Sequence, residues 1–362
     1  MSFSRVIGQQ RAKDILRRAL EHQRTAHAYL FSGPEGVGKE ALAVEFAKAL
    51  LCQSEDERPC DECLNCRRAS TFQHPDFTFL FPSSAKTVDE DRGVLDSLMA
   101  QPYLRLRPWA APTIGIEQIR ALRRNANLKP LEGRQVVVIA DADRMTNGAA
   151  NALLKLLEEP PATLTLLLTV TQTGSLLPTI TSRCQEIRLS PLTDNEIEWA
   201  LVEREGMDPA RAQLLARVSQ GSYRRALEWA AEDFNQRRED VLAFLRACLR
   251  DPYTQITLIE SLTPPSERKR VKEMLSLMLM WFRDAMIIDE RIGADERHLV
   301  HVDYYTILLK FVAAFESIDF DAAFAEIEQS IQMIDRNIQI QLVLIVLMNR
   351  LNRFMKLKGR NV

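Results

Sequence analysis

The chain has 362 residues, enough for two or three domains that each bury a core of their own. Its 47 Lys and Arg residues are balanced by 49 Asp and Glu residues, which excludes an overall basic field for nucleic acid or anionic membranes and leaves only local DNA contacts. No terminal apolar run is long enough for a signal peptide or a membrane span, so we expect a cytoplasmic protein with no membrane partner.

Strands and helices alternate through the first half of the chain. Helical periodicity and apolar runs predict, in order, a helix over 8–24, a strand over 28–31, helices over 40–51 and 116–127, a strand over 134–143, a helix over 149–159, and strands over 164–171 and 185–190. Such alternation is typical of an α/β domain with a mainly parallel sheet, here covering residues 1–191.

The rest of the chain divides into an insertion and two helical regions. Residues 75–113 are poorly periodic and contain several prolines, so we expect a surface insertion over 83–112. After Pro191 the strand signals end, and amphipathic helices predict a small helical lid over 192–233 and a larger all-α domain over 234–362. The predicted helices break near Gly206, Gly221, Asp251 and Pro264.

A phosphate loop follows the first strand. In FSGPEGVGKEAL, residues Gly33, Gly38 and Lys39 fit the pattern GxxxxGK, and Gly36 lies within the same loop. Such glycines let backbone N–H groups converge on phosphate oxygens at a helix N-terminus, and the lysine adds a positive charge. The next position, where a Ser or Thr hydroxyl binds Mg²⁺, is Glu40. We therefore expect a degenerate site in which binding of ATP or ADP is weakened or abolished.

The strand over 134–143 carries a second departure from an active ATPase. In such enzymes an Asp at the end of this strand acts on the metal, and the Glu that follows polarises the attacking water. This chain has Asp141 followed by Ala142, which cannot orient water, and we expect Asp143 to start the turn. The losses at Glu40 and Ala142 agree, and they predict that the chain does not hydrolyse ATP itself.

Four cysteines form the most specific metal motif of the chain. Cys52, Cys60, Cys63 and Cys66 follow the pattern C-x7-C-x2-C-x2-C. In a reducing compartment, clustered thiols bind metal rather than pair as disulfides. Four thiolates match a closed tetrahedral Zn²⁺ site, which has no vacant position for a reaction. We predict a structural zinc module over residues 52–66.

Three arginine-containing stretches are candidates for contact with a ligand. The first stretch is Ser182, Arg183 and Cys184, which lies between two predicted strands. An exposed arginine at such a place is usually the partner of a surface ion pair. In oligomeric ATPases, the arginine at this place instead contacts the γ-phosphate bound by the next subunit. Arg224, in GSYRRAL, opens a helix from which it can reach a nucleotide between domain and lid, or can simply face water. The stretch RALRRNANLK over 120–129 is the only local basic concentration, and such a helix more often faces solvent.

Taken together, these stretches resemble the clamp-loader subunits of the bacterial replicative DNA polymerase, which are members of the AAA+ group. The resemblance covers nearly the whole chain, and its motifs are IGQ at 7–9, HAYLFSGPEGVGK at 27–39, the four-cysteine segment, NALLKLLEEPPA at 151–162, TSRC at 181–184 and GSYRRAL at 221–227. Within this family, Glu40 and Ala142 resemble the delta prime type, which often has a decayed nucleotide site, more than the ATP-hydrolysing gamma/tau type. HPDF at 74–77, WFRDAM at 281–286 and NIQIQLVLIVLMNRL at 337–351 are also similar to delta prime.

The resemblance implies a role in DNA replication as a component of the DNA polymerase III holoenzyme, without an ATPase activity of its own. A subunit of this type lies at one end of a hetero-pentamer of gamma/tau and delta subunits, and its C-terminal helices, here 234–362, join a collar. Its arginine, by position Arg183, completes the ATP site of an adjacent gamma/tau subunit. The assembly opens the sliding clamp and places it on primer-template DNA, to which we expect this chain alone to bind weakly.

Two other interpretations stay open at the level of the residues. In the first, the chain is an active gamma/tau-type motor, in which Glu40 binds Mg²⁺ and another acid, Asp143 or Glu158, positions water. In the second, it is a free-standing, zinc-stabilised DNA-binding protein with a vestigial ATP fold. The first predicts ATP turnover by the isolated chain, and the second predicts retention of duplex DNA at physiological salt.

Overall fold

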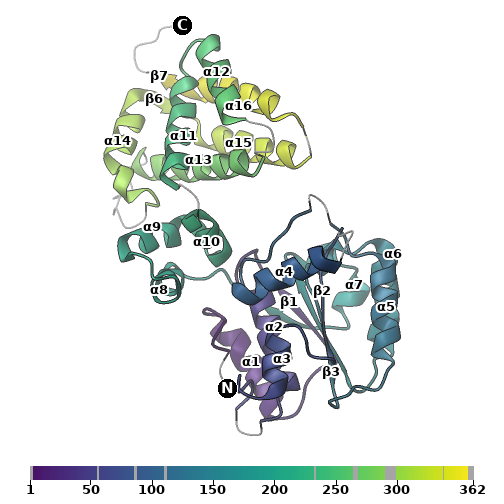
Figure 1. Cartoon of the computed structure of the whole chain (residues 1–362). Coiled ribbons are helices and arrows are strands. Elements are labelled where there is room, and N and C mark those ends of the chain that lie inside the picture. Colours follow the sequence, from purple (N-terminus) through teal and green to yellow (C-terminus); the bar gives the residue numbers. More distant parts are fainter. Residues whose placement is uncertain are drawn as a thin grey trace. The chain divides into compact units, whose positions relative to one another are not determined.

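The computed structural model describes residues 3–54, 57–84, 88–109, 112–231, 234–263, 268–289, 299–336 and 338–357. The chain forms two compact units, Met1–Leu227 and Glu228–Val362 (Figure 1). The predicted α/β domain and most of the helical lid expected over 192–233 share the first unit. The helix break expected near Pro264 lies outside the described residues.

A five-stranded parallel sheet is the centre of the first unit. Its strands lie side by side in the order β2 (Phe77–Leu80), β3 (Gln135–Ile139), β4 (Leu164–Val170), β1 (Ala28–Ser32) and β5 (Gln185–Arg188). Every residue of β1, β3 and β4 is buried, because helices cover both faces, and their sequences therefore read as unbroken apolar runs. The predicted α/β fold with a parallel sheet is confirmed.

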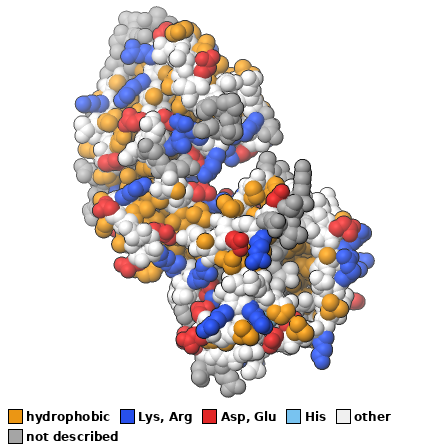
Figure 2. Space-filling view, in the orientation of Figure 1, with side chains coloured by type: hydrophobic (Ala, Val, Ile, Leu, Met, Phe, Trp, Pro, Cys, Tyr) orange, Lys and Arg blue, Asp and Glu red, His pale blue; other side chains and the backbone are white. Residues whose placement is uncertain are grey.

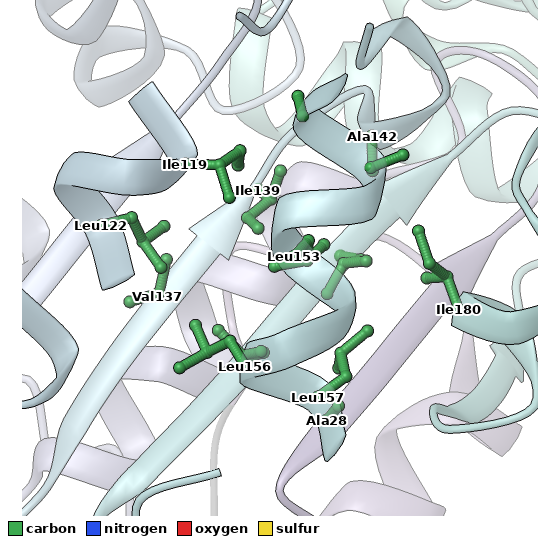
Figure 3. Close-up of a cluster of buried hydrophobic side chains, with 14 of the residues drawn as sticks. Ala28, Ile119, Leu122, Val137, Ile139, Ala142, Leu153, Leu156, Leu157 and Ile180 are labelled. Atoms are coloured by element: carbon green, nitrogen blue, oxygen red, sulfur yellow. The ribbon is translucent and has the colours of Figure 1, made fainter. Parts of the chain in front are cut away.

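Helices cover the two faces of this sheet. On one face, α2 (Lys39–Leu51) packs against β1, β3 and β4, with α1 (Gln10–Glu21) and α3 (Leu64–Ser70) beside it. On the other face, α5 (Ile116–Ala126) and α6 (Asn147–Glu158) pack together, and their apolar side chains meet alternate residues of β3 and β4 (Figure 3). The short helix α7 (Pro178–Thr181) leads into β5.

Part of the aperiodic segment over 75–113, which we expected to form a surface insertion, belongs to the sheet and to a helix that packs on the unit. Residues 77–80 form β2, which pairs with β3, and α4 (Val88–Ala100) buries Val94 and Leu98. The sequence pattern misses β2 because the strand has only four residues and, at the edge of the sheet, buries only Phe77 fully. The segment from α4 to residue 109 then enters a pocket of the first unit, whereas residues 85–87 and 110–111 lie outside the described residues.

Three helices follow the sheet, and local sequence signals set their ends. They are α8 (Asp194–Glu205), α9 (Pro209–Ser219) and α10 (Tyr223–Ala231). Thr193 and Glu196 form a capping box at the start of α8, and Gly206 ends that helix in a left-handed conformation. Gly221 precedes α10 with a φ of +82°, and its carbonyl accepts a hydrogen bond of 3.0 Å from the Leu192 N–H. This bond ties the helices to the chain that leaves β5.

The second unit is built mainly from helices around a buried apolar core. They are α11 (Phe234–Ala247), α12 (Pro252–Leu262), α13 (Arg268–Asp289), α14 (Tyr305–Ala314), α15 (Phe320–Asp335) and α16 (Ile340–Phe354). The predicted helical character of this region is confirmed. One short antiparallel pair, β6 (Phe315–Ile318) and β7 (Met355–Leu357), was not predicted because its strands are too short for a periodic signal. Within the described ranges, no helix is both long and apolar enough to cross a membrane.

Gly221→Ala should destabilise the first unit. A methyl group at this position would lie 2.5 Å from Cβ of Pro191, and its φ of +82° disfavours residues with a side chain. We expect the free energy of unfolding, measured by urea denaturation, to fall by about 1–3 kcal/mol. Gly174→Ala is the control, since an added methyl group there meets nothing within 4 Å. Equal losses in the two variants would contradict this account of Gly221.

Candidate functional site

The phosphate loop, the segment after α4 and the start of α10 meet in one pocket of the first unit. The pocket lies at the carboxyl ends of β1, β3 and β4, where open α/β sheets bind ligands. Its lining residues are Glu35, Gly36, Gly38, Lys39, Glu40, Pro102, Tyr103, Arg105, Arg107, Asp141, Thr171 and Arg224. All the nucleotide-site residues predicted from the sequence are therefore close together, with Gly33 just outside the lining in the same loop.

The lysine of the phosphate loop is turned onto the loop itself. Lys39 Nζ donates to the carbonyl oxygens of Gly33 at 2.7 Å and Pro34 at 2.6 Å. Burial lowers the pKa of the Lys39 ammonium group. Gly36 and Gly38 have φ values of +80° and +99°, so the backbone keeps a left-handed course that glycine favours. The backbone of the cradle is preserved, but its lysine is engaged with backbone carbonyls.

Arg105 lies between the two carboxylates that the sequence places at this site. Its Nη2 atom is 3.2 Å from Glu40 Oε1 and also donates to Asp141 Oδ2. Burial raises the pKa of Glu40, and the nearby charge of Arg105 only partly opposes this shift. The pKa of Asp141 is lowered, because the charges of Arg105 and Arg107 outweigh the effect of burial. One guanidinium therefore holds both acids in a buried ion-pair cluster.

A second set of ion pairs surrounds Glu35 in the phosphate loop. Arg107 donates to Glu35 Oε1, and Arg224 Nη1 lies 3.2 Å from the same oxygen. Burial raises the pKa of Glu35, but these arginines outweigh it and lower the pKa overall. Arg224 thus lies in the predicted site, and there it contacts a residue of its own loop.

Arg105 and Arg107 are two residues of the pocket that the sequence does not mark. They stand in YLRLRP, inside an aperiodic, proline-containing stretch that we expected to lie at the surface. No local pattern marks them, because their partners lie on other elements and come together only in the folded chain.

None of the three positions considered for water activation, Ala142, Asp143 and Glu158, lines the pocket. Ala142 begins the 3₁₀ turn η1 (Ala142–Arg144) and is buried in the core between the sheet and α6 (Figure 3). Asp143 follows in that turn, as predicted, and does not line the pocket. Glu158 ends α6 and pairs with Arg183 at 3.0 Å. The acids that do line the pocket are each paired with an arginine.

Arg183 lies at the opposite end of the sheet from the pocket. It precedes the edge strand β5, where Nη1 donates to Thr179 O at 2.8 Å and Nη2 contacts Glu158. Tyr29 pairs with Gln185, so Arg183 is level with the start of β1, whereas the phosphate loop follows the end of β1. At about 3.3 Å per residue, roughly 20 Å separates the Arg183 backbone from the start of the cradle.

The two neighbours of Arg183 in the SRC motif have different surroundings. Ser182 is exposed, and its hydroxyl donates to Thr179 O at 3.2 Å. Cys184 packs against the apolar core, and burial raises the pKa of its thiol to about 11. Cys184 therefore fixes the turn by packing, which leaves Arg183 as the charged group at the surface.

The basic stretch over 120–129 forms the second half of α5 and the loop after it. Arg120 pairs with Glu117 at 2.6 Å, one turn earlier on the same helix. Figure 2 shows basic and acidic side chains interspersed on the face that it draws. This arrangement is typical of a solvated helix face, and nothing in it singles out a DNA site.

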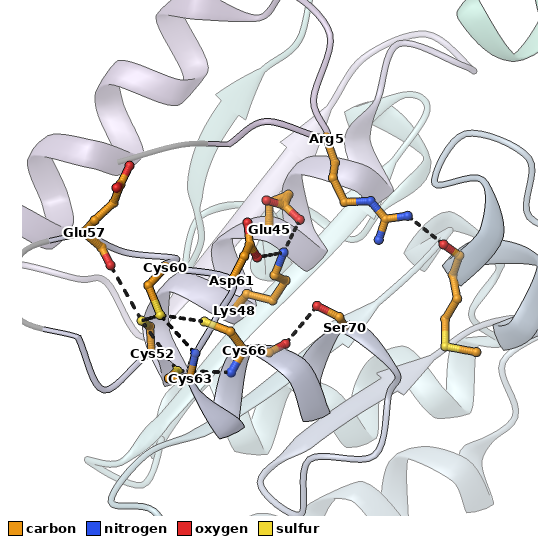
Figure 4. A network of polar contacts seen from close by, with 11 residues as sticks. Arg5, Glu45, Lys48, Cys52, Glu57, Cys60, Asp61, Cys63, Cys66 and Ser70 are labelled. Carbon is orange, nitrogen blue, oxygen red and sulfur yellow. Dashed lines mark hydrogen bonds and ion pairs between the residues drawn. The ribbon is translucent and has the colours of Figure 1, made fainter. Parts of the chain in front are cut away.

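The four predicted cysteine ligands meet in one cluster after α2 (Figure 4). Their Sγ atoms lie within 4.8 Å of one another, and Cys52 and Cys60 are 3.6 Å apart. Tetrahedral Zn–S bonds of about 2.3 Å place sulfurs roughly 3.8 Å apart, so this donor set fits such an ion. Burial raises the pKa of the Cys63 thiol, but backbone N–H groups of Gln53 and Cys66 outweigh it and lower the pKa to about 6.

A buried lysine joins this cysteine module to α2. Lys48 is 1% exposed and pairs with Glu45 at 2.7 Å and with Asp61 of the module at 2.5 Å (Figure 4). Burial lowers the pKa of Lys48, but the two carboxylates outweigh it and raise the pKa. Asn65 Nδ2 adds a hydrogen bond of 3.1 Å to Leu51 O. Protein contacts therefore hold the module against the helix independently of a metal.

Comparison with known proteins gives a consistent set of relatives. The family model described as "DNA polymerase III, delta subunit" matches residues 8–193. The chain is 31% identical over 301 residues to the DNA polymerase III subunit delta' of Bacillus subtilis, covering 82% of each protein. It is 35% identical over 245 residues to the delta' subunit of Pseudomonas aeruginosa, covering 65% of each. It is 33% identical over 233 residues to the tau subunit of Escherichia coli, covering 62% of this chain and only 32% of tau.

The cysteine cluster makes a prediction about metal content. The purified chain should carry one tightly bound metal ion, and zinc is expected because four thiolates form a closed, soft tetrahedral site. Cys63→Ala should lose the ion, as measured by plasma mass spectrometry. Cys248→Ala, which removes a buried cysteine of the second unit, should keep it. A metal-free wild-type protein, prepared without chelator and with all four thiols reduced, would refute the site.

Proposed function

Because the chain belongs to the family described as DNA polymerase III, delta subunit, we propose that it is a delta prime-type subunit of a clamp loader. In this role it hydrolyses no ATP of its own. It assembles with gamma/tau-type and delta subunits in a hetero-pentamer and supplies Arg183 to the ATP site of a gamma/tau-type neighbour. The assembly loads a sliding clamp onto primer-template DNA.

The position of Arg183 is the observation that carries this proposal. The guanidinium is partly exposed beside the edge strand and lies at the end of the sheet away from the chain's own phosphate loop. An arginine side chain is far too short to cover the roughly 20 Å between them. Any nucleotide that Arg183 contacts must therefore belong to another subunit, where its charge stabilises the transition state of phosphoryl transfer.

The chain's own pocket supports the absence of intrinsic ATPase activity. Glu40 stands where a hydroxyl would bind Mg²⁺, and Ala142 is buried where an active subunit has a carboxylate. The alternative of an active motor needs Asp143 or Glu158 to take over. Asp143 does not line the pocket, and Glu158 lies beside Arg183.

A structural zinc ion is the second part of the proposal. Cys52, Cys60, Cys63 and Cys66 would hold it, and it would cross-link the segment between α2 and α3. With all four positions taken by thiolates, the ion would have no position for water or substrate. Its contribution is to the folding of the module.

The second unit carries an apolar row suited to contact with other subunits. Ile338, Leu342 and Val346 are 41%, 56% and 44% exposed, and their spacing of four residues puts them on one side of α16 and of the turn before it. The opposite side of α16 is buried in the core of the unit. An exposed apolar row of this kind is typical of an oligomer contact, which supports the collar role of residues 234–362.

Arg183→Ala should lower the ATPase activity of the reconstituted complex without preventing assembly. Loss of a trans arginine lowers turnover at the affected site by roughly 10³-fold or more. The measurement is ATP turnover by the chain mixed with its gamma/tau and delta partners, clamp and primed DNA. Arg188→Ala, whose side chain is 79% exposed on the same edge strand, should turn over ATP like the wild type. Equal activity of the Arg183→Ala and wild-type complexes would remove the proposed role.

Leu342→Glu combined with Val346→Glu should weaken assembly, because charged side chains cannot be buried unpaired at an apolar contact. We expect the apparent affinity for the partner subunits to fall about tenfold or more, measured by analytical size exclusion at several concentrations. Leu131→Glu, at a 78% exposed leucine in a loop of the first unit, is the matched control. If the double variant assembles like this control, α16 is not part of the collar.

A further inference from the structure

We propose that Glu40 and Asp141 form a binding site for the guanidinium of Arg105, and that this contact within the chain excludes Mg²⁺ and nucleotide from the phosphate cradle. This gives a function to the described part of the segment over 83–112. The proposal deepens the proposed function and rests on it in one respect, namely that the chain turns over no ATP of its own.

The residues of the cradle do not fit a complex of metal and nucleotide. A working loop directs its lysine at phosphate and its next hydroxyl at Mg²⁺, whereas here Lys39 is held by two backbone carbonyls and the hydroxyl is replaced by Glu40. The carboxylates of Glu40 and Asp141 already share one cation, Arg105. A divalent ion at the same carboxylates would meet strong repulsion from the guanidinium.

Arg105 is a buried residue of the pocket, packed against its neighbours, and not a surface arginine. It is 5% exposed, and its guanidinium lies 5.6 Å from the centre of the Phe81 ring. Its Nε and Nη1 atoms are buried without a hydrogen-bond partner among the described residues. A buried guanidinium with free donors is expensive, so it is stable only beside strong opposite charge. The two carboxylates provide that charge.

The two carboxylates need Arg105 as much as Arg105 needs them. Two carboxylates that share a site largely shielded from water repel each other, so one of them must be protonated or both must be neutralised by cations. Arg105 bridges both, with Arg107 Nη2 3.4 Å from Asp141 as a second cation. The residue Glu40 therefore does more than remove the metal-binding hydroxyl. Together with Asp141, it binds the guanidinium of Arg105.

The backbone that carries Arg105 is anchored to three parts of the first unit. Tyr103 Oη accepts a hydrogen bond of 2.8 Å from the Ile7 N–H, and its ring packs edge-to-face on Tyr223 of α10 at 5.0 Å between centroids. A side chain at Gly38 would lie 2.8 Å from the Tyr103 hydroxyl, so the segment rests directly on the phosphate loop. Arg107 adds the ion pair to Glu35.

The start of α10 closes over the same loop. The Tyr223 N–H donates to Gly36 O at 3.1 Å, and a side chain at Gly36 would collide with the Ser222 hydroxyl. Arg224 of the same helix reaches Glu35 at 3.2 Å. The start of α10 and the phosphate loop are thus in direct contact through a hydrogen bond and an ion pair within the chain.

Restoring the hydroxyl separates the effect of Arg105 from that of Glu40. Binding of Mg²⁺ with the non-hydrolysable analogue AMP-PNP is measured by calorimetry on the full chain. Glu40→Thr alone should bind only weakly, because Arg105 still pairs with Asp141. Arg105→Ala with Glu40→Thr should bind at least tenfold more tightly than Glu40→Thr alone. Arg120→Ala with Glu40→Thr, which removes an exposed arginine of α5 outside the pocket and keeps Arg105, should behave like Glu40→Thr alone.

Two outcomes would overturn the proposal. One is binding by Glu40→Thr alone as tight as by the variant that also lacks Arg105, and the other is a folded Arg105→Ala/Glu40→Thr protein that still binds nothing. Thermal unfolding gives an independent measurement. Arg105→Ala should lower the melting temperature, and adding Glu40→Gln should recover part of that loss; independent, additive effects would contradict the shared site.

The outcomes are separable from those of the proposed function. ATP hydrolysis by the isolated wild-type chain would refute both the proposed function and the proposed role of Arg105. Loss of complex ATPase activity in Arg183→Ala, together with nucleotide binding by Glu40→Thr alone as tight as by the variant that also lacks Arg105, would retain the role of Arg183 and remove only that of Arg105.

Discussion

Two buried carboxylates at the carboxyl edge of the sheet decide the chemistry of the pocket. The side chains of Glu40 and Asp141 are only 15% and 10% exposed, and negative charges held away from water are unstable without a compensating cation. Arg105 provides that compensation from within the chain. The anchoring of Tyr103, the ion pairs around Glu35 and the contact between lid and loop all surround this cluster.

The parallel sheet separates the two arginines that bear on the proposed function. Because all five strands run in one direction, loops that follow strands gather at one edge, and residues that precede strands gather at the other. Arg105 acts at the first edge, on the chain's own pocket, whereas Arg183 precedes β5 and is exposed at the second. This separation is what the proposed function requires, since it has one arginine act within the chain and the other on a neighbouring subunit.

The helix α2 connects the pocket to the cysteine module. Its first turn follows the phosphate loop, and Cys52 directly follows its last residue, Leu51. With 13 residues at about 1.5 Å per residue, roughly 20 Å lies between the two sites. Lys48 fixes the module to the buried end of this helix, so the module supports the element that carries the cradle.

Sequence alone determined the features that depend on residues close together in the chain. The buried strands, the phosphate loop, the missing hydroxyl and the four cysteines each have a local pattern, because burial periodicity, tight turns and chelation act over a few residues. The edge strand β2 was missed, since four residues of which only Phe77 is fully buried have too little pattern to separate them from a loop.

Only the tertiary structure showed which cation pairs with the two carboxylates of the degenerate nucleotide site. Arg105 and its carboxylates come from a loop, a helix start and a strand end that are far apart in sequence. Charge neutralisation in a buried site depends on distance in space and leaves no periodic trace along the chain. The sequence could therefore identify the loss of the metal-binding hydroxyl, whereas the arginine that took up the resulting charge became visible only in the fold.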